Sequence, residues 1–213
     1  MPRHSWALKA GFWACIVIAI AAVLRRAFAL QHPVSVGGPP ELLQLDAFFQ
    51  THAALTRVHI FTTLLYVSLL PCVFWRRTRH FQIVRLLFYA LGIGVCLSAF
   101  AMSAHPVGGA VEGAAILFYN SLFLVSLLLS FHAWRAGQER NSLRWTLRAT
   151  AVSLGIATTR PVMGIFFATS RLTHWTPQLF FGPAFWIGFS INAILMELWL
   201  RKHPLFSQRR WHE

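Results

Sequence analysis

The chain has 213 residues, of which 56% are hydrophobic and only 12% are charged. An average soluble domain carries about 25% charged residues, so this composition excludes an ordinary water-soluble globule and predicts that lipid covers most of the surface. The formal net charge is +13, but the basic residues stand in short clusters between long apolar runs, which indicates loops facing anionic lipid and argues against nucleic-acid binding.

Six apolar runs are long enough to cross a bilayer as helices, which takes about 20 residues each. They cover residues 6–30, 54–75, 83–104, 110–134, 146–169 and 179–200. The runs are continuous rather than short and alternating, so a membrane barrel is set aside. The sequence therefore predicts an all-α polytopic membrane bundle with six transmembrane helices, as a single domain over residues 1–213.

The first run has two interpretations. Arg3 and Lys9 resemble the basic start of a signal peptide, and Ala27-Phe28-Ala29 resembles its cleavage site. However, Arg25 and Arg26 stand where cleavage requires small uncharged residues, and the run is long for a signal peptide. We expect an uncleaved helix. After it, a Gly/Pro run over 33–40 breaks the chain, and the amphipathic stretch that follows is expected to lie on the outer interface.

The distribution of Lys and Arg predicts the orientation of the chain. With a cytoplasmic N-terminus, four basic residues lie outside: Arg25, Arg26, Arg57 and Arg171. Fourteen lie inside: Arg3, Lys9, Arg76, Arg77, Arg79, Arg85, Arg135, Arg140, Arg144, Arg148, Arg201, Lys202, Arg209 and Arg210. By the positive-inside rule, both termini are cytoplasmic, as expected for a multi-pass protein of the inner membrane.

Arg160 is the strongest candidate for a functional residue, because it stands near the middle of the fifth run. A charge at that depth costs about 2.5–3.5 kcal/mol on insertion scales, so it should face the bundle interior and have a partner. Asn120 is a candidate neighbour at similar depth, and Glu112 a candidate if the Arg160 side chain extends outward. Pro161 is expected to kink the helix. One interpretation is a site for a small anionic or lipid-like ligand; the other is a structural link between helices.

Histidines near the outer boundary offer a different chemistry. His59, His105, Arg57 and Glu112 are expected to form one external polar cluster with His52. Two neutral imidazoles on facing helices can hold a b-type haem, and His59 with His105 is the plausible outer pair. The alternative is that these histidines hydrogen-bond lipid headgroups or loops.

Other features are interpreted as structural. Glu197, near the inner end of the sixth run, is expected to form an ion pair with one of Arg85, Arg144 or Arg148. The three cysteines lie in apolar runs without a C-x-x-C pair, so they predict neither a disulfide framework nor a zinc site. The usual phosphate-loop, dinucleotide, nucleophile-elbow and zinc-protease motifs are absent from the sequence, so a soluble-type catalytic site is unsupported.

The order of several motifs resembles the bacterial membrane family DUF2306 over residues 50–170. The motifs are His59-Ile60, Pro71, Phe74, Arg76-Arg77, His80, Arg85, Arg135-Ala-Gly, Arg144-Trp145-Thr-Leu-Arg148 and Arg160. The chain departs from the family pattern at Val84-Arg85, at His80-Phe81 and at Ser142, where the family has Gly-Arg, His-Arg and a second His. The resemblance implies an architecture and candidate positions but no reaction.

Three hypotheses about function follow. The first is a membrane protein that binds a small anionic or lipid-like ligand near Arg160. The second is a b-type haem protein that exchanges electrons with quinone. The third is an accessory or structural subunit of a larger membrane complex, in which the polar residues only join helices.

Overall fold

The computed structural model describes residues 4–32, 40–75, 77–78 and 81–203. The described residues form helices and no strands, so the predicted all-α class is confirmed. The helices are α1 (His4–Gln31), α2 (Pro40–Thr51), α3 (Ala53–Phe74), α4 (Gln82–Met102), α5 (Gly109–Arg135), α6 (Glu139–Ser153), α7 (Gly155–Thr173) and α8 (Pro177–Lys202). Several basic residues used for the orientation, and His80, lie outside the described residues; the basic ones are Arg3, Arg76, Arg79, Arg209 and Arg210.

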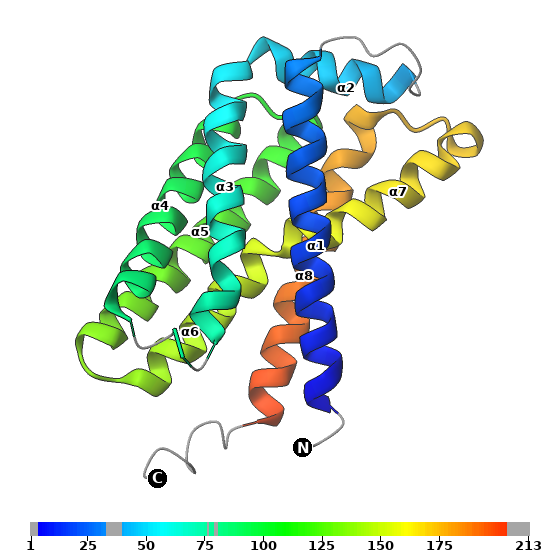
Figure 1. Ribbon diagram of the computed structural model, residues 1–213. Helices are drawn as coiled ribbons and strands as arrows, with labels where there is room; N and C mark the ends of the chain where they lie inside the picture. The colour runs from blue at the N-terminus through cyan, green and yellow to red at the C-terminus, as the bar shows by residue number, and fades with distance from the viewer. Residues whose placement is uncertain (1–3, 33–39, 76, 79–80, 204–213) are drawn as a thin grey trace.

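Six segments are long and apolar enough to cross a membrane, as predicted. They are Leu8–Gln31, Ala53–Phe74, Gln82–Met102, Gly109–Arg135, Glu139–Ser170 and Pro177–Lys202. Figure 1 shows that α1 begins and α8 ends at the same end of the bundle, here called the basic end, and that α2 lies across the opposite end, here called the α2 end. The stretch predicted to be amphipathic after the Gly/Pro run is the short helix α2.

The fifth span differs from its predicted bounds of 146–169. It starts at Glu139 and is built from two helices, α6 and α7, which meet at Leu154. Arg160 is therefore 21 residues from the start of the span and only 10 from Ser170, so it lies in the half nearer the α2 end and not near the middle. The change of helix falls at Leu154, whereas Pro161, where a kink was expected, lies inside α7.

A side chain from α8 stabilises the junction between α6 and α7. The Asn192 Nδ2 donates a hydrogen bond to the Ala151 carbonyl (3.2 Å), which is the acceptor that the Gly155 N–H would use in a regular helix. The Asn192 Oδ1 accepts a hydrogen bond from Thr158 (2.7 Å). Because a backbone carbonyl in lipid must be satisfied from within the protein, this amide compensates for the junction.

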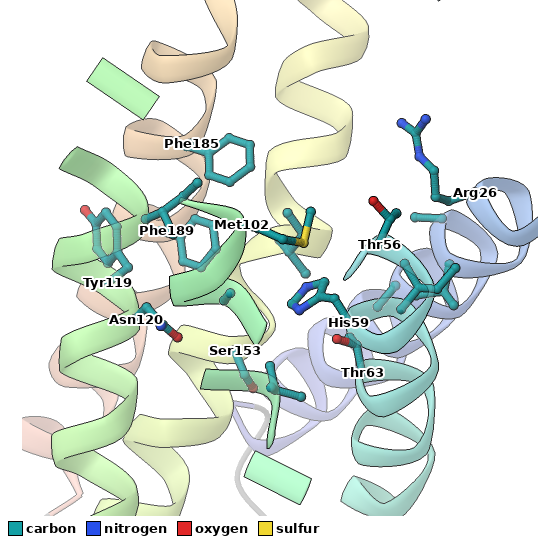
Figure 2. Close-up of a pocket in the computed structure, with 18 of the residues that line it drawn as sticks. Arg26, Thr56, His59, Thr63, Met102, Tyr119, Asn120, Ser153, Phe185 and Phe189 are labelled. Atoms are coloured by element: carbon teal, nitrogen blue, oxygen red, sulfur yellow. The ribbon is translucent and has the colours of Figure 1, made fainter. Parts of the chain in front are cut away.

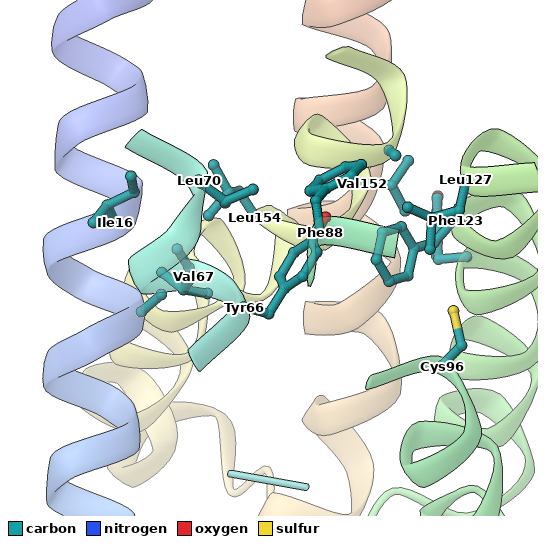
Figure 3. Packing of buried hydrophobic residues seen from close by; sticks show 14 of the residues in the cluster. Ile16, Tyr66, Val67, Leu70, Phe88, Cys96, Phe123, Leu127, Val152 and Leu154 are labelled. Atoms are coloured by element: carbon teal, nitrogen blue, oxygen red, sulfur yellow. The ribbon is translucent and has the colours of Figure 1, made fainter. Parts of the chain in front are cut away.

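The interior is packed with aromatic and aliphatic side chains from α1, α3, α4, α5 and the α6–α7 junction (Figure 3). Tyr66 and Leu70 of α3, Phe88 of α4 and Leu127 of α5 are almost completely buried. A second, smaller cluster around Phe180 and Met163 lies near the α2 end. Large apolar side chains such as Phe61 and Ile165 are exposed on the outside of the bundle, as expected where lipid is the solvent.

Candidate functional site

A cavity of about 220 Å³ lies inside the bundle, toward the α2 end. Its walls come from α1, α3, α4, α5, the α6–α7 span and α8, and Phe49 of α2 lies at its edge. Figure 2 shows His59 and Asn120 on opposite sides of this space, with Phe185 and Phe189 of α8 above Asn120. The walls are mostly apolar, so each polar or charged group on them is informative.

Arg160 lines the cavity from α7. Its Nε atom is buried and has no hydrogen-bond partner among the described residues. Its Nη1 lies 3.9 Å from the thioether sulfur of Met163, which is a weak acceptor. No ion pair joins Arg160 to a carboxylate in the described part of the chain, so the predicted partner of this guanidinium is missing.

Two further arginines lie near Arg160 and both are already neutralised in part. Arg26 donates a hydrogen bond to Asp46 of α2, and its guanidinium lies 4.0 Å from the centre of the Phe49 ring. Arg25 binds the same carboxylate at 2.8 Å. The positive charges of both residues repel Arg160. Arg25 and Arg26 thus share one carboxylate, Arg160 has no ion pair among the described residues, and the local excess of positive charge favours an anion.

Asn120 and Glu112 both line the cavity but neither is bonded to Arg160, contrary to the expected pairing. The Asn120 Nδ2 donates to the Cys96 carbonyl (2.9 Å), which links α5 to α4. The buried Glu112 carboxylate accepts a hydrogen bond from the Gly108 N–H one turn before it. Neither side chain bonds Arg160 because each reaches a backbone partner without crossing the cavity.

His59 presents one ring nitrogen to the cavity. The Ser98 hydroxyl oxygen lies 2.9 Å from the His59 Nδ1 and within hydrogen-bond distance of the carbonyls of Gly94 (2.8 Å) and Val95 (3.0 Å). When the Ser98 proton goes to a carbonyl, the oxygen accepts from His59 Nδ1–H, and the Nε2 of this neutral tautomer carries a lone pair. In that tautomer His59 offers Nε2 as an acceptor or as a ligand.

The remaining predicted members of the outer polar cluster do not all line the cavity. His105 lines the cavity edge, and its ring stacks on His52 with the centroids 4.3 Å apart. No contact joins His59 to His105 in the described structure. Arg57 is exposed and does not line the cavity. Only part of the predicted cluster is thus brought together at one site.

The acidic residues at the basic end form ion pairs, and Glu197 pairs with one of its expected partners. Glu197 is bonded by Arg148 (3.0 Å), one of its three candidate partners, and Arg201 lies 3.6 Å from it. Arg85 instead holds Glu139 at 2.7 Å. No ion pair joins Arg144 to a described carboxylate.

Metal-binding clusters are absent from the described part of the chain, where no three His, Cys, Asp or Glu side chains converge. Sequence analysis missed the roles of Arg26, of Asp46 and of the Phe185–Phe189 wall. For Arg26 and Asp46 the sequence does contain a signal. A pair of arginines stands near the end of one helix, and an acidic residue follows in the next, amphipathic helix. No family model, no curated protein and no solved structure matches this chain.

Proposed function

We propose that this chain is an integral membrane protein that binds a small anionic or lipid-like molecule in its cavity, with Arg160 as the charged anchor. The observation that carries this proposal is the half-buried Arg160 side chain on the cavity wall, whose buried Nε has no hydrogen-bond partner and which has no carboxylate partner among the described residues. Burying an unpaired charge costs several kcal/mol, so such groups in membrane proteins are typical of ligand or ion pathways.

The test is ligand-dependent stability of the purified protein in a nonionic detergent. An anion that binds only the folded state should raise the thermal midpoint, and the midpoint should rise with the logarithm of the anion concentration once that exceeds the dissociation constant. We expect at least one member of a panel of carboxylates, phosphates and anionic lipids to stabilise the native protein, and Arg160→Gln to lose that response. If no member of the panel shifts the midpoint of the native protein, the proposal is wrong.

A second candidate is b-type haem ligation with electron exchange to quinone, and it is favoured by His59. The Ser98 hydroxyl lies 2.9 Å from the His59 Nδ1, and in the tautomer with Nδ1–H this bond orients a histidine ligand and leaves Nε2 free to coordinate. The cavity volume of 220 Å³ is below the roughly 300–1,000 Å³ of sites for drug-sized ligands, so haem would require the helices to separate. An optical spectrum after expression with added haem decides this: without a Soret band, the haem hypothesis fails.

We also propose that both termini are cytoplasmic and that the chain resides in a bacterial inner membrane, as the resemblance to DUF2306 implies. The support is the unequal charge: Arg77, Arg85, Arg140, Arg148 and Arg201 belong to the basic end, against Arg25, Arg26 and Arg57 at the other. Alkaline phosphatase fused after residue 213 should be inactive, whereas insertion in the 33–39 segment should give activity. The reverse pattern would invert the orientation.

A further inference from the structure

The size of the cavity limits what can bind in it. An engineered cavity of about 150 Å³ is filled by one benzene molecule, so 220 Å³ corresponds by proportion to roughly nine or ten non-hydrogen atoms. A phospholipid with two acyl chains is several times larger. The cavity therefore cannot enclose a membrane lipid.

The shape of the cavity is long compared with its volume. Lining residues run from Thr56 to Val67 on α3 and from Glu112 to Phe123 on α5. Each of these stretches is twelve residues, whose eleven steps span about 16 Å of helix. A small volume spread over that length favours an unbranched chain over a compact ring system.

Charge is confined to one end of this space. On the α6–α7 wall the lining residues are Val152, Ser153, Ile156 and Arg160, and Arg160 is the one nearest the α2 end. Arg26, which also lines the cavity, is already bonded to Asp46. Glu112 is turned toward the Gly108 N–H. One guanidinium is thus left for one anionic group.

The walls farther from Arg160 are largely apolar. Val67, Val95, Phe123 and Phe189 line them, and the Phe185 and Phe189 rings stack at 5.8 Å on α8. Of the polar groups there, Asn120 bonds Cys96 and Ser153 donates to the Thr150 carbonyl (2.9 Å), so these two are satisfied by the protein. The buried Thr63 and Tyr66 hydroxyls have no hydrogen-bond partner among the described residues and can bond a water molecule beside the ligand.

We propose that the cavity binds an unbranched monocarboxylate of about six to eight carbons, with its carboxylate on Arg160 and its chain directed toward Val67 and Phe123. This inference rests on the proposed function and narrows it to one ligand class. Inorganic anions lack the apolar chain, and long-chain fatty acids exceed the volume.

Isothermal titration of the full-length protein in a nonionic detergent tests the inference with a matched series of ligands. Hexanoate and octanoate should bind. Acetate, which has the charge without the chain, and octanol, which has the chain without the charge, should each bind at least tenfold more weakly than octanoate, since a charged hydrogen bond and several buried methylenes are each worth that much. Hexadecanoate should bind more weakly than octanoate.

Variants at the two ends of the cavity distinguish recognition of the ligand's carboxylate from recognition of its hydrocarbon chain. Arg160→Gln should reduce octanoate affinity to that of octanol, and Arg160→Lys should restore part of it. Val67→Phe should fill the far end and shift the optimum to about four carbons, and Ala19→Leu is a second filling variant if Val67→Phe does not fold. Each of these two filling variants should bind the shorter acid at least as well as the native protein does.

The outcomes distinguish the two levels of proposal. If affinity rises steadily through hexadecanoate in the native protein and in Val67→Phe, detergent partitioning explains the signal and the size-limited site is wrong. If phosphate or acetate binds as tightly as octanoate, the ligand class is wrong while an anion site at Arg160 stands. If neither these acids nor the wider panel of anions binds, the proposed function itself fails.

Discussion

Gly188 of α8 lies directly against Thr159 of α7, the residue that precedes Arg160. A methyl group on Gly188 would come within 2.6 Å of the Thr159 Cα and backbone nitrogen, so the two helices touch backbone to backbone. Small residues permit such close approach in membrane bundles. This contact fixes the helix that carries Arg160 against α8, the helix that carries the Phe185–Phe189 wall.

Gly188→Ala should therefore destabilise the protein by about 1–3 kcal/mol, because the methyl group overlaps the Thr159 backbone. Gly164→Ala is the matched control. It lies in α7 with no atom within 4 Å of an added Cβ, and should be neutral or stabilising by roughly 0.5–1 kcal/mol through helix propensity. Thermal midpoints measured in one detergent give the comparison, and equal effects of the two substitutions would contradict the contact.

Arg160→Met should raise the stability of the protein without ligand. Replacing a buried, unpaired charge by an apolar side chain of similar length removes its desolvation cost, and such changes gain about 1–4 kcal/mol. Arg148→Met is the control, because it breaks the ion pair with Glu197 and should lower stability by about 1 kcal/mol. Chemical or thermal unfolding of the two variants measures the sign. A clear loss of stability in Arg160→Met would mean that this guanidinium has a structural partner.

Asp46→Asn should loosen α2. The carboxylate of Asp46 binds both Arg25 and Arg26, and among the described side chains Gln50 Nε2 also donates a hydrogen bond to the Ala29 carbonyl of α1 (3.1 Å). Without the charge, amide hydrogen exchange should become several-fold faster across Pro40–Thr51. Glu139→Gln, which breaks the pair with Arg85 at the basic end, should leave exchange in α2 unchanged. If amide hydrogen exchange in α2 is no faster in Asp46→Asn, the ion pairs of Asp46 do not hold α2 against α1.

The architecture was predictable because lipid imposes a strong constraint on sequence. Every backbone group within the hydrocarbon must be bonded internally, so a run of about 20 apolar residues has essentially one solution. The start of the fifth span at Glu139 was not predicted, because the stretch from Glu139 to Arg148 is polar and does not read as part of an apolar run. In the structure this stretch belongs to α6, and Arg148 forms an ion pair with Glu197 at the basic end. The junction at Leu154 was also missed, because it depends on Asn192, a tertiary partner 41 residues from Ala151.

The candidate site was only partly predictable. Arg160, Asn120, Glu112 and His59 were identified because polar side chains in apolar runs are conspicuous, and all four line one cavity. Their partners could not be read from the sequence, since a rotation of a helix by one residue decides whether Asn120 meets Arg160 or the Cys96 carbonyl. For the same reason the unpaired state of Arg160, on which the proposed function depends, appears only in three dimensions.

Replacement of Thr158 by cysteine tests how α1 closes the cavity. The Cys15 Sγ of α1 lies 3.9 Å from the Thr158 Oγ1 of α7, and α1 contributes Ala19, Ala22 and Arg26 to the cavity wall. With Thr158→Cys, mild oxidation should join the two sulfurs, because their side chains already meet at a separation that small rotations bring to bonding distance. If the disulfide forms, two fewer thiols per chain react with a maleimide-polyethylene glycol reagent, and a reductant restores their reaction. Cys15→Ala combined with Thr158→Cys should show no protection, whereas failure of the single variant to crosslink would mean that α1 does not rest on α7 in the membrane.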